Sequence, residues 1–431
     1  MNRRLLVISN GHGEDVIAVK IIQELWKLQK INFSSDSSQE YCPINITALP
    51  MVGEGFAYQK IDIPLLGKVQ KMPSGGFIYM DGRQLWKDIK SGLVGLTLHQ
   101  YQQVKQWSRE GGLILAVGDI LPLLWANLSG VNYFFVGTAK SEYYLRNEEG
   151  WLEDVSIVDR FLGSIYYPWE RWLMSSKSCL GIFPRDSLTV ESLQNYGIRA
   201  YDYGNPMMDD VDISFSPVQN PDDEYTLKVL LLPGSRLPEA LDNWQLILSA
   251  VDSLLEIQDL DLRFVGAIAS SLNLNVFAEI AQKFQWKPIQ KKSVNIPIED
   301  PDKMILTKNK AQLILSQNSY AQSLQYCDIS IAMAGTATEQ FVGLGKPAIA
   351  FAGTGAQYNP KFAKNQSRLL GISLQLVENP QQVKDKVQEL LSNPDLWQSI
   401  SVNGKKRLGS AGGAKKIARE LLSKLTKRSE V

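Results

Sequence analysis

The chain has 431 residues, enough for two or three domains that each bury a core of their own. Its 45 basic and 45 acidic residues balance, which argues against nucleic acid as a partner. The three cysteines lie far apart, with no Cys-x-x-Cys pair and no Cys/His cluster, so neither a disulfide framework nor a structural zinc site is expected.

The first predicted element is a strand over residues 5–9, followed by the loop sequence SNGHGED and a helical pattern. The apolar run before the loop is too short for the core of a signal peptide. The loop places His12, one of only two histidines, between Gly11 and Gly13. Imidazole titrates near neutral pH without assistance, so we interpret His12 as a candidate general base.

Two acids follow this histidine, Glu14 and Asp15, and either carboxylate could fix the tautomer of the imidazole. Together with Gly11 and Gly13 they form a predicted substrate-binding loop. The alternative is that His12 caps or packs the first helix, in which case the two glycines only serve a tight turn.

Further strands in the first half are predicted at residues 45–50, 113–118, 133–137, 180–184 and 200–204. Several are apolar almost without alternation, which is typical of parallel strands covered by helices on both faces. The most apolar region is interrupted by Asp119, Pro122 and Asn127, which excludes a membrane span. We therefore expect a cytoplasmic protein, or one held at a membrane surface.

Asp119 directly follows the strand at 113–118, in the sequence AVGDILP. We interpret it as the second candidate catalytic residue. It is either the rival base to His12 or the partner that orients the imidazole, and the sequence leaves both alternatives open.

Residues 209–226 are acidic, contain two prolines and show no apolar period, so they are predicted to be an interdomain linker. They separate a first domain over 1–208 from a second over 227–401. The second half repeats the strand pattern at 228–233, 262–269, 312–316, 329–334, 347–353 and 374–377. The fold class is therefore α/β, with two doubly wound domains that bind ligands beyond the carboxyl ends of their strands.

The first turn of the second half reads LLLPGSRLPEA, a buried strand that runs into a helix. Gly234 lets the backbone approach a ligand closely, and Ser235 can cap the helix or donate to a phosphate. Arg236 supplies a fork suited to a diphosphate. The alternative is an ordinary turn with a surface arginine.

A second turn follows the strand at 329–334, in ISIAMAGTATEQ. Gly335, Thr336 and Ala337 would open a helix with N–H groups aimed at a pyrophosphate, and Thr338 continues that turn. Glu339 is placed to accept hydrogen bonds from ribose hydroxyls. The alternative is that Glu339 only complements the helix dipole.

A third polar stretch, GTGAQYNPKFAKNQSRLLG, begins at Gly353. Gln357, Asn359 and Gln366 offer neutral donors and acceptors that suit sugar hydroxyls, and Tyr358 offers an apolar ring face. The alternative is a plain polar loop.

Together these stretches resemble the sugar-nucleotide half of a GT-B glycosyltransferase, most closely the lipid-A-disaccharide synthase family. The resemblance rests on LLPGSRLPE, MAGTATEQ and YGNPMMDDV, the last at 203–211. In the first half the match is looser. VISNGHGED lies where the family has a Gly-Glu-Ala-Ser-Gly-Asp loop, and AVGDILP where it has a Gly-x-Asp loop with a catalytic aspartate. The chain is identified as a divergent lipid-A-disaccharide-synthase-like protein.

The resemblance implies GT-B architecture, with two Rossmann-like domains facing across a cleft. It also implies an inverting transfer of a sugar from a UDP-sugar to a lipid-like or membrane-associated acceptor, without a metal or other cofactor. Gly234, Ser235 and Arg236 would hold the diphosphate and nucleotide, Gly335 to Thr338 would add backbone donors, and Glu339 would meet the ribose. The family further suggests a homodimer, and a last helix at about 402–431 that returns to the first domain.

Three segments are compatible with peripheral membrane contact: the aromatic stretches at 83–107 and 166–174, and the basic C-terminal segment. The alternative for the two aromatic stretches is helices packed on the first sheet. Two other functions stay open, a non-hydrolysing UDP-sugar epimerase and a non-catalytic sugar-nucleotide binder. A Rossmann dehydrogenase is disfavoured, because GHGEDV lacks the third glycine of the dinucleotide fingerprint.

Overall fold

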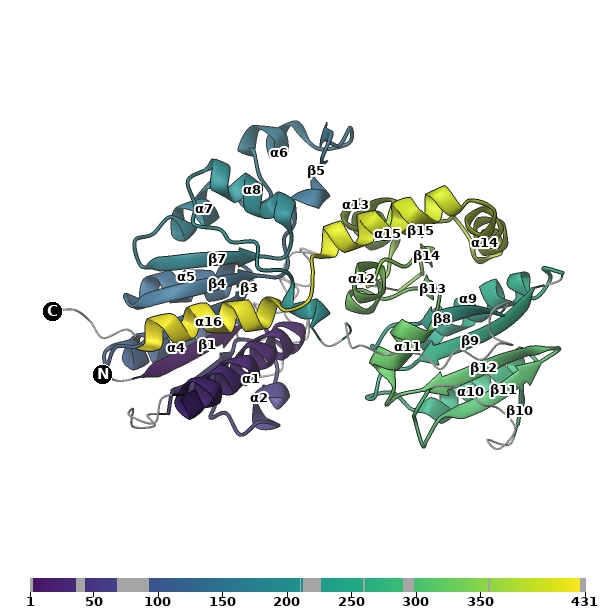
Figure 1. Cartoon of the computed structure of the whole chain (residues 1–431), viewed down its shortest axis with the longest axis horizontal. Helices are drawn as coiled ribbons and strands as arrows, with labels where there is room; N and C mark the ends of the chain where they lie inside the picture. The colour runs from purple at the N-terminus through teal and green to yellow at the C-terminus, as the bar shows by residue number, and fades with distance from the viewer. Residues whose placement is uncertain are drawn as a thin grey trace. The chain divides into compact units, whose positions relative to one another are not determined.

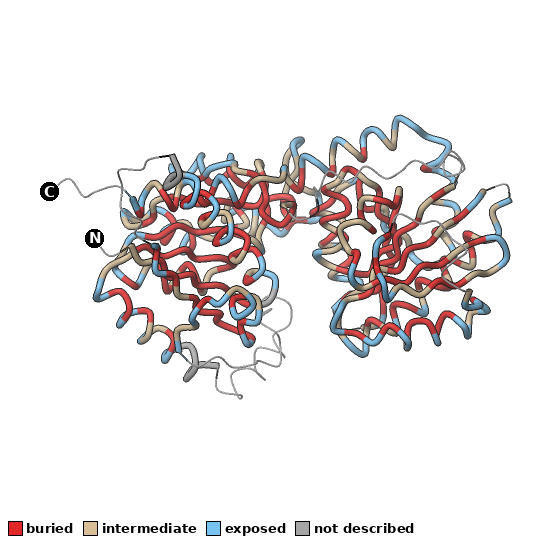
Figure 2. Tube along the Cα trace, turned by 60° about the horizontal axis from the view of Figure 1, so that its bottom comes forward, coloured by how far each residue is buried: buried red, intermediate tan, exposed pale blue. Residues whose placement is uncertain are grey.

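The computed structural model describes residues 3–35, 43–67, 93–209, 211, 226–258, 260–289, 298–355 and 357–426; within these ranges the side chains of residues 12, 32–35 and 93–97 are not described. The chain forms two compact units (Figure 1). The first combines Met1–Met207 with Ala411–Val431, and the second is Met208–Ser410. Each unit is an α/β domain, and in both the buried residues concentrate in the strands and in the helix faces turned toward them (Figure 2).

The first unit is built on a parallel five-stranded sheet in the order β2-β1-β3-β4-β7. Its strands are β1 (Arg4–Ser9), β2 (Asn45–Pro50), β3 (Leu113–Gly118), β4 (Asn132–Gly137) and β7 (Cys179–Pro184). A two-stranded hairpin, β5 (Arg146–Asn147) and β6 (Gly150–Trp151), stands apart from the sheet. The helices are α1 (His12–Ser35), α2 (Phe56–Gln59), α4 (Leu93–Ser108), α5 (Ile120–Ser129), α6 (Ile157–Leu162), α7 (Pro168–Met174), α8 (Ser187–Asn195) and α16 (Gly413–Thr426).

Alternation along β1 builds a core on each face of this sheet. Leu5 and Val7 belong to one buried cluster, which includes residues of α1 and α16, whereas Leu6 and Ile8 belong to the opposite cluster. The helices α1 and α16 lie side by side on the first face (Figure 1).

The second unit is built on an eight-stranded sheet in the order β10-β11-β12-β9-β8-β13-β14-β15. Its strands are β8 (Thr226–Leu232), β9 (Asp261–Ala267), β10 (Lys287–Pro288), β11 (Met304–Lys308), β12 (Ala311–Ser316), β13 (Ile329–Ala332), β14 (Ala348–Ala350) and β15 (Leu374–Leu376). Pairing is parallel from β12 to β15, and the pairs β10–β11 and β11–β12 are antiparallel. The helices are α9 (Glu239–Leu254), α10 (Leu274–Lys283), α11 (Tyr320–Tyr326), α12 (Thr336–Gly343), α13 (Pro360–Leu370), α14 (Val383–Ser392) and α15 (Pro394–Leu408).

The expected α/β fold with parallel sheets is confirmed, but the strand predicted at 200–204 is wrong. Only Ala200 forms a bridge, to Ile182, and the chain then leaves the sheet. Tyr201 and Tyr203 instead stack on each other, with ring centroids 5.6 Å apart, and Tyr203 stacks on Phe183 at 5.3 Å. The tyrosines of the predicted strand therefore pack as aromatic rings beside the sheet.

The C-terminal segment predicted as one helix over about 402–431 contains two helices that belong to different units. Helix α15 ends at Leu408 in the second unit, and α16 begins at Gly413 in the first. Gly409 and Gly412 between them adopt positive φ angles of 72° and 90°. Most of the predicted linker at 209–226 lies outside the described residues, as do residues 427–431.

None of the described helices is long and apolar enough to cross a membrane.

Candidate active site

Polar residues of the first unit gather where β1, β3 and β4 end. Because these strands are neighbours, Asn10 after β1 lies against Asp119 after β3. The Asn10 side-chain oxygen accepts a hydrogen bond of 3.2 Å from the Asp119 backbone N–H. The Asp119 carboxylate caps helix α5 by accepting from the Leu121 N–H at 3.1 Å, and burial raises its pKa.

The two glycines around His12 have different surroundings. Gly11 has a φ of 147°, and a Cβ there would lie 2.6 Å from the carbonyl oxygen of Val52, so only glycine fits. Around Gly13, no described atom beyond its chain neighbours and the backbone of its own helix lies within 4 Å of the corresponding position. Helix α1 begins at His12, but the histidine side chain lies outside the described part of the chain, so its catalytic role stays a prediction.

Glu14 faces the same strand ends as Asp119. The hydroxyl of Thr138, the residue after β4, donates to Glu14 Oε1 at 3.3 Å. Burial, together with the nearby carboxylate of Asp119, raises the pKa of Glu14 to about 7. A carboxyl group with that pKa can accept or give a proton near neutral pH, which is the property required of a general acid or base.

Asp15 lies behind the loop, which differs from the substrate contact that we expected of it. Its Oδ1 accepts a 2.6 Å hydrogen bond from Ser9, whose hydroxyl also lies 2.6 Å from the Tyr58 hydroxyl. All three side chains are buried. Asp15 therefore anchors the first turn of α1 to the core.

Cationic residues that the sequence analysis did not single out complete this edge. Lys140 pairs with the buried Glu170 at 2.6 Å, and its charge partly offsets the rise in the pKa of Asp119. Arg185, the first residue after β7, donates to the carbonyl of Thr138 at 3.3 Å. Asn10, Thr138 and Arg185 each directly follow a predicted strand, and this was the signal that could have found them.

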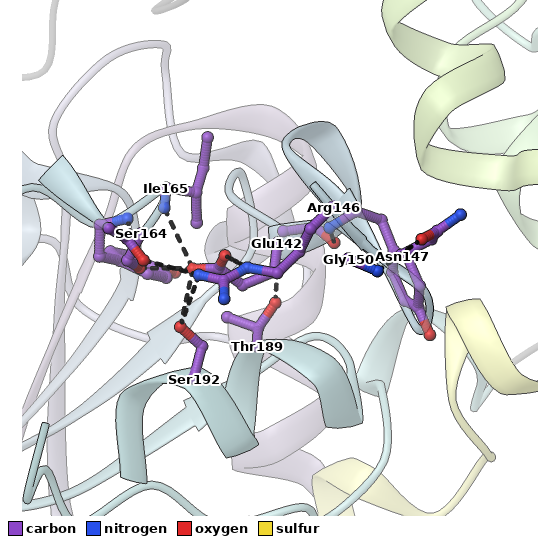
Figure 3. Close-up of polar contacts among 12 residues, drawn as sticks. Glu142, Arg146, Asn147, Gly150, Ser164, Ile165, Thr189 and Ser192 are labelled. Carbon is purple, nitrogen blue, oxygen red and sulfur yellow. Dashed lines mark hydrogen bonds and ion pairs between the residues drawn. The ribbon is translucent and has the colours of Figure 1, made fainter. Parts of the chain in front are cut away.

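The buried carboxylate of Glu142 forms several hydrogen bonds within the long segment that connects β4 to β7 (Figure 3). Glu142 accepts from Arg146 Nε at 2.6 Å, from the Ser192 hydroxyl at 3.0 Å and from the Ile165 N–H at 3.1 Å, and also from Ser164. Its own N–H donates to Thr189 at 2.9 Å. Because Thr189 and Ser192 belong to α8, which follows β7, these hydrogen bonds attach the segment between β4 and β7 to helix α8.

In the second unit, the Pro-Gly-Ser-Arg turn follows β8. Gly234 has a φ of 95°, and its backbone passes close to the end of β13, since a Cβ there would lie 3.3 Å from the Met333 carbonyl. Ser235 is exposed and Arg236 is partly buried, which lowers the pKa of the arginine. We had considered that Ser235 caps the following helix. It does not, because α9 starts later, with Pro238 at its N-cap.

The second predicted phosphate turn opens helix α12, with Gly335 at the N-cap. The first N–H groups of a helix lack partners within the helix, and no side chain caps them here. Thr336 is exposed, while Ala337 and Glu339 are partly exposed. Thr338 is buried, with its hydroxyl bonded to the Ala334 carbonyl at 2.6 Å and its N–H to the Gly335 carbonyl at 3.1 Å, which differs from the backbone donor that we expected.

The three neutral side chains predicted to contact a sugar differ in their exposure. Gln357 is exposed, whereas Asn359 caps α13 by accepting from the Phe362 N–H at 2.9 Å. Gln366 is buried and donates to the Ala334 and Gly335 carbonyls at 3.0 and 3.1 Å. Asn359 and Gln366 therefore support the loops, which differs from the sugar contacts that we expected.

The three polar stretches converge, because β8, β13 and β14 are neighbours in the sheet. Asn243 of α9 links two of them by donating to the Pro233 carbonyl at 3.1 Å and the Met333 carbonyl at 3.5 Å. A set of N–H donors, a guanidinium and a carboxylate at a helix start is suited to a nucleoside diphosphate. Among the described residues, no group of three or more His, Cys, Asp or Glu side chains could hold a metal ion.

No protein-family model and no curated protein sequence matches the chain. Solved structures do match it over its whole length. The calicheamicin glycosyltransferase CalG4 aligns with a TM-score of 0.57 at 12% identity, over 99% of both chains. MurG from Acinetobacter baumannii gives 0.53 at 10% identity, over 97% of this chain and 99% of that one. UDP-GlcNAc 2-epimerase from Neisseria meningitidis, bound to UDP-GlcNAc, gives 0.52 at 14% identity, over 98% and 100%. The likeness shows that the chain has the GT-B fold.

Proposed function

We propose that the protein is an inverting glycosyltransferase of lipid-A-disaccharide-synthase-like type, which moves a sugar from a UDP-sugar to a lipid-like or membrane-associated acceptor. The observation that carries this proposal is the convergence of three polar stretches at the carboxyl ends of β8, β13 and β14. In this proposal Arg236 and the first N–H groups of α12 bind the diphosphate, and Glu339 binds the ribose. The UDP-GlcNAc in the matching epimerase structure supports the same donor class.

The transfer needs a base for the acceptor hydroxyl. As the base removes the proton, the acceptor oxygen attacks the anomeric carbon from the face opposite UDP, and the bond from that carbon to the diphosphate oxygen breaks. UDP leaves with the bonding electrons, and Arg236 and the start of α12 stabilise its charge. His12 and Asp119 remain the candidate bases, and Glu14 joins them because its pKa of about 7 suits proton transfer.

The acceptor class is supported by exposed apolar side chains on α6 and α7, which we call the α6–α7 surface. Arg171 of α7 donates to the carbonyl of Leu162 at the end of α6, at 3.0 Å, so the two helices form one surface. No residue of α6 is buried. The surface consists of Ile157 (85% exposed), Val158 (66%), Phe161 (89%), Trp169 (54%) and Trp172 (71%). Apolar side chains with tryptophan and arginine beside them suit the interface of a lipid bilayer.

A second candidate function is UDP-sugar epimerisation, which is favoured by the epimerase among the matching structures. Product analysis separates the two reactions. The protein is incubated with a panel of UDP-sugars, with and without a lipid extract. A transferase releases UDP and forms a glycolipid only with the extract, while an epimerase forms a new UDP-sugar without it. A non-catalytic binder forms neither product, which would contradict the proposed transfer.

A further inference from the structure

The carboxylate of Glu239 joins two of the polar stretches in the second unit. Glu239 is the first residue of α9, three positions after Arg236. It accepts from the Gln357 N–H at 3.0 and 3.2 Å and from the Tyr358 N–H at 2.5 Å. An acid in the first turn of a helix complements the helix dipole on its own. Here it also binds a segment more than a hundred residues away.

The backbone of that segment lies directly against the carboxylate. A Cβ at Gly355 would stand 2.3 Å from Glu239 Cδ and 2.6 Å from its Oε1. Any side chain at this position would push the carboxylate away from the N–H groups that it accepts from. Glycine at 355 is therefore a requirement of this contact.

The same segment is also linked to the start of α12, through the side chains of Tyr358 and Gln366. The Gly353 N–H donates to the Tyr358 carbonyl at 2.9 Å, and the Tyr358 hydroxyl donates to Gln366 Oε1 at 2.8 Å. Gln366 in turn donates to the carbonyls of Ala334 and Gly335. The segment thus connects the turn at Arg236 to the helix start that we assign to the pyrophosphate.

We propose that Glu239 is a latch that holds Gly355, Gln357 and Tyr358 against the start of α9, and that it thereby positions the nucleotide. Hydrogen bonds from backbone N–H groups to a carboxylate are about twice as strong as neutral ones, so the latch sets where this segment rests. Its effect on the nucleotide rests on the proposed function, whereas its effect on the segment does not.

The test compares three variants of the full chain. Glu239→Ala removes the latch, and Glu239→Gln keeps the side-chain volume and one acceptor oxygen. Asp242→Asn is the matched control, because Asp242 is an exposed acid in the same first turn of α9. Hydrogen–deuterium exchange of peptides covering 353–358 is measured without ligand, and the affinity for UDP is then measured by calorimetry.

We expect Glu239→Ala to speed exchange of residues 357 and 358 and to weaken UDP binding, each by about tenfold. Glu239→Gln should fall between that variant and the wild type, and Asp242→Asn should change neither measurement. Unchanged exchange in both Glu239 variants would overturn the latch. Faster exchange with an unchanged UDP affinity would overturn the positioning role.

A wild-type protein that does not bind UDP would contradict the proposed function, and the exchange data would still decide whether the latch exists. If Glu239→Ala fails to fold, Glu239→Gln decides by the same two measurements, since it preserves the volume of the side chain.

Discussion

Gly11 and Gly13 flank the same histidine, but only one of them is required by its surroundings. Gly11 combines a φ of 147° with a close approach to the Val52 carbonyl, whereas Gly13 lies inside helix α1 with no described atom near its Cβ position beyond its chain neighbours and the backbone of that helix. A Gly-x-Gly pattern in a sequence does not separate these two cases. The φ angle of each glycine and the distance from its Cβ position to neighbouring atoms, such as the Val52 carbonyl, separate them.

Gly11→Ala should therefore lower the free energy of unfolding by about 1–3 kcal/mol, because alanine is strained at this φ and clashes with the backbone. Gly13→Ala should raise it by about 0.5–1 kcal/mol, because alanine favours the helix. Urea denaturation of both variants measures the difference. Equal effects of the two substitutions would contradict the structure of this loop.

Glu14 gives a pH dependence whose sign follows from its pKa. The folded protein raises this pKa from 4.5 to about 7, so it holds the proton more tightly than the unfolded chain does. The stability that protonation provides is present at low pH and is lost as pH rises through about 7. Glu14→Gln imitates the protonated form, so it should be as stable as the wild type at pH 4, below the unfolded pKa, and more stable by about 3 kcal/mol at pH 8. Thermal unfolding at both pH values checks this, and a gap that shrinks toward pH 8 would contradict it.

At the scale of single elements, α6 leaves Ile157, Val158 and Phe161 exposed, and α7 leaves Trp169 and Trp172 exposed. Phe161 and Trp172 are mostly exposed although the helices that carry them are fixed by Glu142, Arg146 and the Lys140–Glu170 pair. Phe161 and Trp172 are therefore exposed although hydrogen bonds and ion pairs hold their helices in place. Of the two helices, only α7 lies in one of the three segments that the sequence analysis named as candidates for membrane contact, because the apolar residues of α6 are too few to show a period.

The double variant Phe161→Ser, Trp172→Ser should weaken binding to vesicles of mixed phosphatidylcholine and phosphatidylglycerol by about tenfold or more, since about 1.5–3 kcal/mol is lost for each apolar side chain removed. Its folding stability should change little, because both side chains are exposed. Val402→Ser, at an exposed position of α15, is the matched control. A wild-type protein that ignores these vesicles at low salt would contradict a membrane role for the α6–α7 surface.

Most strands were predictable, because parallel strands buried on both faces leave apolar runs such as those at 113–118 and 228–233. The strand β11 was missed, although it forms a hairpin with β12 through Asn309 at a φ of 53°. Its residues MILTK have only partial burial and no clear alternation. The site was predictable where a residue directly follows a strand, as with Asp119. It was not predictable for Glu239 and Gln366, whose partners depend on how distant segments pack.

At the scale of the whole molecule, the first unit is completed by a segment far from the rest of it in the chain, whereas the second unit is one continuous stretch. Helix α16 lies on α1 and buries Ile417, Ala418 and Leu421 completely. The Tyr203 hydroxyl adds a 2.8 Å hydrogen bond to Glu420. The first unit therefore cannot close its core until the last helix has been made.

A chain that ends at Ser410 should lose the cooperative unfolding transition of the first unit. Each buried Ile or Leu of α16 contributes about 1.5–3 kcal/mol, and several together match the stability of a whole domain. The second unit lacks no element in that chain, so its transition and its affinity for UDP should remain. Calorimetry resolves the two transitions. Loss of both unfolding transitions, or of neither, would contradict the division into units.

The central claim is that the second unit binds UDP through the start of α12. The most direct measurement is calorimetric titration of the full chain with UDP, GDP, ADP and NAD, with Glu339→Ala beside the wild type. We expect binding of UDP alone, and a loss of about tenfold or more in Glu339→Ala, because a ribose hydroxyl loses a charged acceptor. Absence of binding by any of the four nucleotides, or equal binding by the variant, would contradict the account.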